Sequence, residues 1–279
     1  MMEKVGLIGY PLGHSISPVF QQAAFDELGL SVRYELWETD PDKLGNTVKG
    51  LLAEDKLGSN VTVPYKEDVI PFLDDLNEIA RDIGAVNTIV KLDGKLIGYN
   101  TDAEGFLRAV EIEGKFDPEA KTVTMIGAGG VARAIGFILV KSGAKVLNLF
   151  DIDQNRAEKL ASELKTPQVN VLKSNSGTEY ESAVSSADLL INCTPIGMKH
   201  SSSEGQSPVA RELISSQSLV YDVVYNPLKT PLLETAEKAG IPALGGLSML
   251  VYQGVAAFEL WTGKQAPVNT MMKAAAGAF

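Results

Sequence analysis

The feature that most constrains this chain is a glycine-rich turn between an apolar strand pattern and a helical pattern, in residues 122–139. Gly127, Gly129 and Ala132 form a G-x-G-x-x-A motif there. The first glycine permits a tight turn, the second lets the backbone approach a pyrophosphate, and the alanine keeps the helix close to the strand. The helix N-terminus adds free N–H groups and partial positive charge. The motif therefore predicts a doubly wound α/β domain that binds a dinucleotide, the alternative being a purely structural turn. The residues expected to hold the phosphates are Gly127, Ala128, Gly129, Gly130 and Val131.

An acidic residue ends the next expected strand, which has the sequence VLNLF. A carboxylate at that place, Asp151, can accept hydrogen bonds from the ribose hydroxyls of NAD and would repel the 2′-phosphate of NADP. The alternative is a turn in which Asp151 or Asp153 is a helix N-cap.

Strand patterns alternate with helical periods along most of the chain, which predicts parallel βαβ units in sheets covered on both faces. Asp93-Gly94 between two apolar runs predicts a β-hairpin. After a polar loop, the alternation restarts near residue 122. We expect a first domain of residues 1–103 and 240–279, to which the C-terminal helices return, and a second domain of residues 104–239.

Composition narrows the class of function. A length of 279 residues is typical of about two domains. The net charge of −10 argues against nucleic acid and anionic membranes as partners, but not against a small anion. One cysteine and two histidines make a disulfide framework or a metal site unexpected. The N-terminus lacks a signal-peptide pattern and no apolar run is long enough to span a membrane, so we expect a cytoplasmic protein.

Several motifs occur together and in a fixed order along most of the chain: LIGYPLGHSISP, NVTVPYK, GAVNT, YNTDAEGF, GAGGVARA, NCTPIGM, YDVVYNP and GLSMLVYQGVAAFELWTG. In this combination the sequence resembles the shikimate dehydrogenase family. The resemblance implies an N-terminal α/β substrate domain, a Rossmann-like NAD(P)-binding domain and a cleft between them. It also implies reversible, nicotinamide-dependent interconversion of 3-dehydroshikimate and shikimate, a step of aromatic amino-acid biosynthesis.

The resemblance further implies a substrate site made of short polar side chains. Ser15 and Ser17 would hold the carboxylate, with a local turn and a helix N-cap as the alternative roles. Asn60 and Thr62 alternate on a strand and so share one face, although turn bonding is the alternative there. Gln253 lies in an apolar helix and must be exposed or hydrogen-bonded. The complete set of expected substrate residues is Ser15, Ser17, Asn60, Thr62, Asn87, Tyr225 and Gln253, where Tyr225 is expected to end a strand.

By the same resemblance, Lys66 is the acid/base and Asp102 is its partner. Oxidation of an alcohol removes a hydride and a proton, so a proton acceptor near the reacting oxygen is useful. A lysine in water is protonated at neutral pH. The residues therefore leave open whether Lys66 takes the proton or mainly stabilises developing negative charge. The alternatives are a solvated lysine and an N-cap aspartate.

The cofactor region departs from the family pattern in one respect. The usual pattern is Asn-Arg-Thr, in which the arginine binds the NADP 2′-phosphate, whereas this chain has Asp151, Ile152 and Asp153. Arg156 matches a second family arginine. One basic group against two acidic groups predicts a preference for NAD, with NADP as the alternative. By resemblance, Thr194, Val223 and Gly246 line the nicotinamide end, with packing and turns as the alternative.

Two other functions remain open at this stage. Quinate-preferring relatives often have threonine at the position of Ser17, so serine favours shikimate, but a quinate or dual quinate/shikimate dehydrogenase is the alternative. A non-catalytic module that senses cofactor and ligand is the other, although it would not need both Lys66 and Asp102. Either a monomer or a homodimer is compatible with the sequence.

Overall fold

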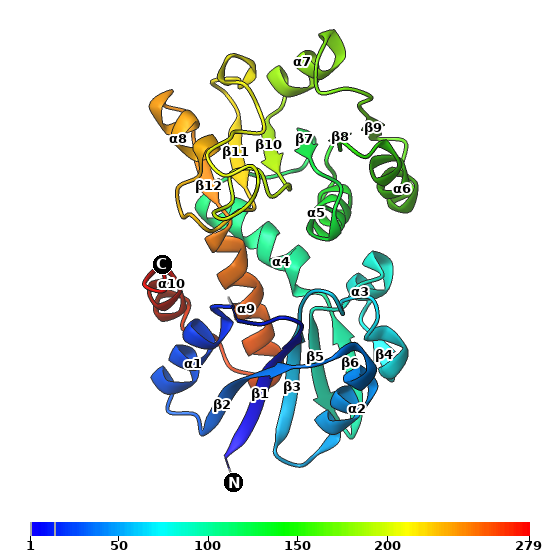
Figure 1. Cartoon of the computed structure of the whole chain (residues 1–279), viewed down its shortest axis with the longest axis vertical. Helices are drawn as coiled ribbons and strands as arrows, with labels where there is room; N and C mark the ends of the chain where they lie inside the picture. The colour runs from blue at the N-terminus through cyan, green and yellow to red at the C-terminus, as the bar shows by residue number, and fades with distance from the viewer. Residues whose placement is uncertain (1, 14) are drawn as a thin grey trace. The chain divides into compact units, whose positions relative to one another are not determined.

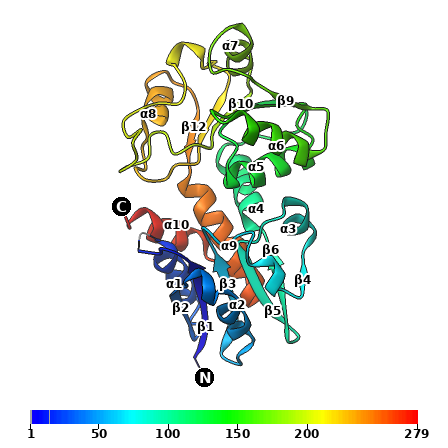
Figure 2. The same cartoon turned by 45° about the vertical axis from the view of Figure 1, so that its right-hand side comes forward.

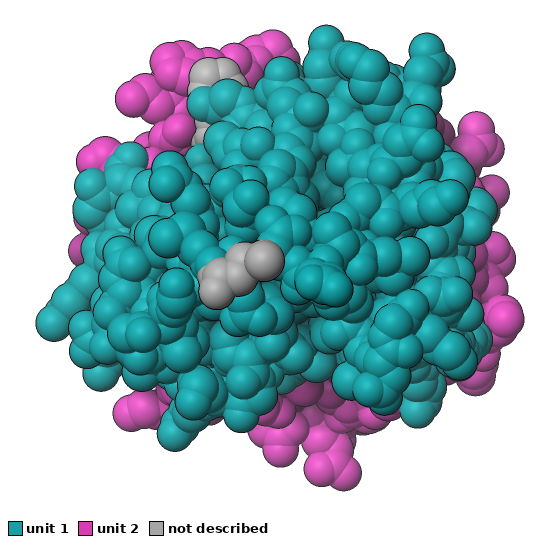
Figure 3. Space-filling model, turned by 90° about the horizontal axis from the view of Figure 1, so that it is seen from below, with its two compact units in different colours: residues 1–105, 251–278 teal, residues 106–250, 279 magenta. Residues whose placement is uncertain are grey.

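The computed structural model describes residues 2–13 and 15–279, and the chain divides into two compact units (Figures 1 and 2). The first unit contains residues 1–105 and 251–278, and the second contains residues 106–250 and 279. The first unit is thus built from two segments distant in the sequence, and Figure 3 distinguishes the two units by colour. The unit boundaries fall inside two helices, α4 (Thr101–Arg108) and α9 (Leu247–Thr262).

The first unit is built on a six-stranded sheet with the order β2-β1-β3-β5-β6-β4. Its strands are β1 (Glu3–Gly9), β2 (Val32–Glu38), β3 (Lys56–Val61), β4 (Asp75–Leu76), β5 (Thr88–Leu92) and β6 (Lys95–Tyr99). Its helical segments are α1 (Ser17–Glu27), η1 (Pro41–Lys43), α2 (Leu44–Lys49), η2 (Gly50–Leu52), η3 (Ile70–Phe72), α3 (Glu78–Ile83) and α10 (Val268–Ala276).

This sheet is mixed rather than wholly parallel. The strand β1 pairs in parallel with both β2 and β3, whereas β5 runs antiparallel to β3 and β6. The β5–β6 hairpin turns at Asp93 and Gly94, whose φ angles of 50° and 74° suit the turn that the dipeptide predicts. Helices cover both faces of the sheet. The helices α2 and α3 pack on the face of Ile8, and α9 packs on the opposite face, where Trp261 lies beside Tyr34. The helices α1 and α9 contact each other through Phe25 and Phe258, whose ring centroids are 4.9 Å apart.

The second unit contains a six-stranded sheet in which every strand pair is parallel. Its strands are β7 (Thr122–Ile126), β8 (Val146–Phe150), β9 (Val169–Val171), β10 (Leu189–Asn192), β11 (Leu219–Asp222) and β12 (Ala243–Gly245). Its helices are α5 (Gly130–Lys141), α6 (Gln154–Leu164), α7 (Thr178–Ser185), η5 (Arg211–Leu213) and α8 (Pro231–Lys238), together with the π-helical turn η4 (Ala109–Glu113).

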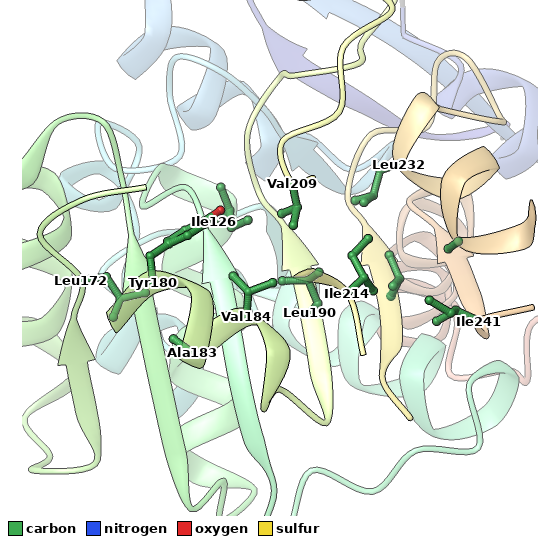
Figure 4. Packing of buried hydrophobic residues seen from close by; sticks show 12 residues of the cluster. Ile126, Leu172, Tyr180, Ala183, Val184, Leu190, Val209, Ile214, Leu232 and Ile241 are labelled. Atoms are coloured by element: carbon green, nitrogen blue, oxygen red, sulfur yellow. The ribbon is translucent and has the colours of Figure 1, made fainter. Parts of the chain in front are cut away.

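The strand order β12-β11-β10-β7-β8-β9 is that of a doubly wound dinucleotide-binding fold, which confirms the predicted fold class. The order reverses between β7 and β10, and ligands of such sheets bind outside the carboxyl ends of the strands at that point. One face of the sheet is buried by α7 and α8, where Val184 and Leu232 join Ile126 and Leu190 in an apolar cluster (Figure 4).

The expected return to the first domain at residue 240 is too early. The strand β12 pairs with β11, so residues 243–245 belong to the second sheet, and the chain changes unit only at residue 251, within α9. The strand β3 ends at Val61, so Thr62 lies just beyond its end and not on the strand, as was expected for it together with Asn60. No helix in the described part of the chain is both long enough and apolar enough to cross a membrane.

Candidate active site

The topology of the first unit gathers most of the expected substrate residues at one edge of its sheet, the edge formed by the carboxyl ends of β1 and β3. Ser15 follows β1, and Asn60 lies at the carboxyl end of the neighbouring β3. Because β5 is antiparallel to β3, Asn87 at its start reaches the same edge, where Asn60 faces Thr88 across the two strands. Asp102 follows the end of β6, the next strand. Residues distant in sequence are therefore neighbours because of strand order and direction.

An ion pair lies at the centre of this edge. The Lys66 Nζ donates to the Asp102 Oδ2 over 2.6 Å, and the two side chains are 30% and 13% exposed. The other carboxylate oxygen, Oδ1, accepts a hydrogen bond from the Asn87 Nδ2 over 2.9 Å. The backbone carbonyl of Lys66 also accepts from the Val86 N–H over 2.7 Å. The structure thus brings together the two expected catalytic residues, with one carboxylate oxygen facing each donor.

The buried Asn87 carboxamide connects this pair to the helix α9. Its Nδ2 also donates to the Gln253 Oε1 over 3.4 Å, so Gln253 is buried and hydrogen-bonded, one of the two states expected for it. Its Oδ1 accepts from the Thr101 N–H over 2.7 Å and lies 3.1 Å from the hydroxyls of Thr88 and Thr101. Both Nδ2 hydrogens are therefore engaged inside the protein, which suits a residue that holds its neighbours in place.

A second group joins Asn60 to the helix α1. The Tyr34 hydroxyl donates to the Asn60 Oδ1 over 2.8 Å and also shares a side-chain hydrogen bond with Ser17. Ser17 is the first residue of α1 and does not cap it: the cap position is Ile16, without a side-chain bond. Ser15 makes the local turn, because its Oγ accepts from the Ser17 N–H over 3.3 Å. The sequence contained no signal for Tyr34 beyond an inward place on a strand.

Two of the expected substrate residues are less closely tied to this group. Thr62 lies just after β3, where its methyl group packs against Gly9. Tyr225 belongs to the second unit and lies three residues beyond β11, because that strand ends at Asp222 rather than at the tyrosine. Burial raises the pKa of Tyr225, and its ring contacts Phe279 edge-on. Its contact with substrate stays a prediction.

The glycine loop of the second unit lies at the switch point of the sheet. Gly127 has a φ angle of 102°, and a β-carbon there would lie 2.9 Å from the Cys193 backbone and the Thr194 side chain, so the fold itself requires glycine. Gly129 and Gly130 differ, because a β-carbon at either would meet no protein atom within 4 Å. The N-terminus of α5 has no side-chain cap. An open, uncapped helix N-terminus fits a pyrophosphate.

Asp151 is bound to this loop. Its Oδ2 accepts from the Ala128 N–H over 2.7 Å and its Oδ1 from the Asp153 N–H over 2.8 Å, so each oxygen keeps a lone pair for a ribose hydroxyl. Asp153, rather than Asp151, caps the helix α6. It also pairs with Arg156 over 3.3 Å, while Ile152 is 97% exposed. The local turn and the ribose contact are therefore compatible roles.

The residues expected at the nicotinamide end lie at the ends of three adjacent parallel strands. Thr194 follows β10, Val223 follows β11 and Gly246 follows β12. The Val223 N–H donates to the Asn192 carbonyl over 3.0 Å, and a β-carbon on Gly246 would overlap the Val223 carbonyl. The three backbones are thus packed closely, and glycine at position 246 is needed for that approach.

A buried carboxylate that the sequence reasoning missed supports these loops. Asp222 is fully buried and accepts from the Thr230 hydroxyl over 2.6 Å, the Asn192 Nδ2 over 2.9 Å and the Val224 N–H over 3.1 Å. Burial raises the pKa of Asp222 to about 6, although the three hydrogen bonds oppose the shift. Asn192 in turn accepts from the Thr194 hydroxyl over 2.6 Å. Asp222 therefore anchors two of the loops that are expected at the nicotinamide end.

This shift makes part of the stability depend on pH. The pKa of Asp222 is higher in the folded protein than the ordinary value of 3.8, so its stabilising contribution is full below about pH 4 and is lost as the pH rises through about 6. One pH unit below the folded pKa, this contribution is about 1.4 kcal/mol. We expect the free energy of unfolding, relative to Asp222→Asn, to fall by about that amount between pH 5 and 7.5. Urea titrations followed by circular dichroism test this, with exposed Asp82→Asn as the control; a parallel pH dependence in Asp222→Asn would contradict it.

Comparisons with known proteins give the same assignment for both units. Residues 7–89 match the shikimate dehydrogenase substrate binding domain, residues 110–204 match shikimate/quinate 5-dehydrogenase, and residues 246–276 match the shikimate 5′-dehydrogenase C-terminal domain. The shikimate dehydrogenase (NADP(+)) of Methanopyrus kandleri is 46% identical over 97% of this chain and 93% of its own length.

Two solved structures are similar over nearly the whole chain. The shikimate 5-dehydrogenase of Thermus thermophilus, in complex with NADP(H) and shikimate, has a TM-score of 0.88, 34% identity and full coverage of both chains. That of Listeria monocytogenes, in complex with shikimate and NAD, has a TM-score of 0.92 and 34% identity, and covers 98% of this chain and 96% of its own.

Proposed function

Because the chain belongs to the shikimate dehydrogenase family, we propose that it catalyses the reversible, nicotinamide-dependent reduction of 3-dehydroshikimate to shikimate. The observation that carries this proposal is the Lys66–Asp102 pair, 2.6 Å apart at an edge of the sheet where Asn60, Asn87 and Gln253 also gather. A ligand-sensing module would need the polar cluster but not a proton donor held by a carboxylate.

The residues of the first unit account for the proton and for orientation. When bound, the nicotinamide supplies a hydride to the substrate carbon or accepts one from it. In the reducing direction Lys66 donates a proton to the carbonyl oxygen, and in the oxidising direction the proton returns from the hydroxyl to Lys66. Asp102 balances the charge of Lys66 and holds its Nζ in one direction, while Asn87 holds Asp102.

The chain's own cofactor residues support NAD as the preferred form. The 2′-phosphate of NADP is a dianion, and it would meet the carboxylates of Asp151 and Asp153. The nearby cation, Arg156, is already paired with Asp153. Ile152 stands where the family's usual arginine would bind the phosphate. The Methanopyrus kandleri relative is named for NADP(+), so the proposed preference for NAD rests on these side chains of the chain alone.

Replacing Ile152 with arginine tests this preference directly. The Ile152 side chain is 97% exposed, so the substitution disturbs no packing. We expect kcat/KM for NADP to rise roughly tenfold or more, because a charged hydrogen bond to phosphate contributes about 1.5–3 kcal/mol. We expect kcat/KM for NAD to change less. Arginine at exposed Leu92 is the control for added charge. A KM for NADP well below that for NAD in the unmodified protein would contradict the proposed preference.

The substrate assignment is tested by the absorbance of the reduced nicotinamide, with shikimate and quinate each crossed with NAD and NADP. Turnover with shikimate and NAD supports both parts of the proposal, whereas higher kcat/KM for quinate would point to the alternative dehydrogenase. Absence of turnover in all four combinations would favour the ligand-sensing module. Light scattering during gel filtration distinguishes the monomer from the homodimer.

A further inference from the structure

We propose that Tyr34 is a positioning residue of the substrate site, which holds the Asn60 carboxamide so that it accepts a hydrogen bond from a substrate hydroxyl and donates none. This inference rests on the proposed function, because it concerns how the same site recognises shikimate. None of the motifs that identify the family contains Tyr34, which lies inside β2.

The hydrogen bonds of Asn60 restrict what it can offer a ligand. Its Nδ2 donates to the Asn87 carbonyl over 3.2 Å and to the Thr88 hydroxyl over 3.0 Å, which uses both hydrogens. Its Oδ1 accepts from the Tyr34 hydroxyl over 2.8 Å and retains one lone pair. A flipped carboxamide would place Oδ1 against the Asn87 carbonyl, two acceptors facing each other. Asn60 therefore has acceptor capacity left and no donor.

Strand register explains why Tyr34 can reach Asn60. In β1, Val5 pairs with Tyr34 on one side, and Leu7, two residues later, pairs with Asn60 on the other. Residues two apart lie on the same face of a sheet, so both polar side chains project from that face. The Tyr34 ring also lies 6.4 Å from that of Trp261, whose Nε1 is bonded to the Ile89 carbonyl over 3.0 Å. Packing thus limits the movement of the phenol.

The direction of the hydrogen bond between Tyr34 and Asn60 is also determined. Burial raises the pKa of Tyr34 far above its ordinary value, so the phenol keeps its proton and acts as a permanent donor to Asn60. Because that single proton is directed to Asn60, the hydrogen bond with Ser17 requires Ser17 to donate to the tyrosine oxygen. Tyr34 thus connects two residues expected to contact the substrate, Ser17 on α1 and Asn60 on β3.

The consequence is a chemical rule for the substrate. The group that meets Asn60 must carry a hydrogen to donate, so the site selects a hydroxyl there and disfavours a carbonyl, an ether or a fluorine. A site that leaves buried polar groups unpaired with the wrong ligand discriminates strongly against it. Removing the phenol hydroxyl should weaken this discrimination, because the Asn60 carboxamide then loses the bond that holds its oxygen.

The main test is Tyr34→Phe, which removes one oxygen and keeps the ring. We expect the KM for shikimate to rise roughly five- to fifty-fold while kcat stays within about twofold and the KM for the cofactor is unchanged. Tyr180→Phe is the matched control, because Tyr180 is equally buried but lies in the apolar cluster of the second unit. An unchanged KM for shikimate in Tyr34→Phe would overturn the proposal.

A double-mutant cycle separates positioning from general destabilisation. If Tyr34 acts through Asn60, then Tyr34→Phe raises the KM for shikimate in the unmodified protein but adds almost nothing in an Asn60→Ala background. Multiplying effects on KM would instead show that the two residues act independently, and would overturn the proposal. Turnover of the unmodified protein with shikimate is measured first, so that failure of the proposed function is recognised separately.

Substrate analogues test the acceptor rule without any substitution in the protein. At each shikimate hydroxyl that is not oxidised, the hydroxyl is replaced by hydrogen or by fluorine, which does not donate. We expect one position at which the deoxy and fluoro analogues lose the same factor in KM, at least about tenfold. If fluorine restores the KM at every position, no hydroxyl is read by an acceptor and the proposal is wrong.

Discussion

Lys66→Ala is expected to lower kcat by roughly 10²–10⁴-fold, the range associated with loss of a positioned acid/base group. The affinity for the dinucleotide should be unchanged, because Lys66 lies in the first unit and the glycine loop lies in the second. Steady-state rates with shikimate measure the first effect, and fluorescence titration with reduced nicotinamide measures the second. The chain should keep its fold, since the Lys66 side chain is 30% exposed and packs no core.

A matched control exists in the same unit. Lys43 pairs with Asp40 over 2.7 Å, nearly the same distance as in the Lys66–Asp102 pair, but its side chain is 71% exposed. Lys43→Ala should leave kcat within about twofold, since exposed pairs contribute little. Lys66→Arg distinguishes proton transfer from stabilisation of negative charge, because arginine keeps the charge and does not release its proton near neutral pH. If Lys66 transfers the proton, Lys66→Arg should lower kcat as Lys66→Ala does. Full kcat in Lys66→Ala would remove this residue from the mechanism.

Asp102→Asn is expected to lower kcat by roughly 10²-fold or more, although the side chain keeps its size. The carboxylate accepts from Lys66 on one oxygen and from Asn87 on the other. A carboxamide has only one oxygen, so whichever way it turns, its NH₂ group faces another donor. The expected result is a displaced Lys66 with unchanged dinucleotide affinity, measured by the same rates and titration.

Combining the two substitutions tests whether the residues act as a unit. If Asp102 acts by holding Lys66, then Lys66→Ala with Asp102→Asn should lose no more in kcat than Lys66→Ala alone. Asp40→Asn is the control, because it removes the carboxylate from the exposed pair with Lys43. A double variant whose loss is the product of the two single losses would show that Asp102 has a role of its own.

Local features of the fold could be predicted from the sequence because they depend on residues close together in the chain. The strand, glycine turn and helix around Gly127 are confirmed, since the turn needs a positive φ that glycine adopts readily. The hairpin at Asp93 and Gly94 is confirmed for the same reason. The predicted end of the β11 strand at Tyr225 is wrong, because β11 ends at Asp222, where the Val224 N–H donates to the Asp222 carboxylate instead of to a neighbouring strand.

The connections of the candidate site could not be predicted in this way. Asn87 and Gln253 are 166 positions apart in the chain, and only the packing of α9 in the first unit makes them partners. Tyr34 belongs to no recognisable sequence motif. Its contact with Asn60 depends on the register of β1 with two neighbouring strands, which the sequence does not reveal. Asp222 lies within the strand that the sequence predicts, and only the tertiary structure shows that its carboxylate is completely buried.

The sequence by itself determined the doubly wound cofactor fold, the family, and the residue types available for proton transfer and binding. These follow from short patterns whose meaning depends on local backbone geometry and on the chemistry of single side chains. Only the tertiary structure decided which donor meets which acceptor: Lys66 with Asp102, Asp102 with Asn87, and Asn60 with Tyr34. The physical reason is that hydrogen bonds form over about 3 Å, and strand order, strand direction and register set such distances between segments remote in the chain.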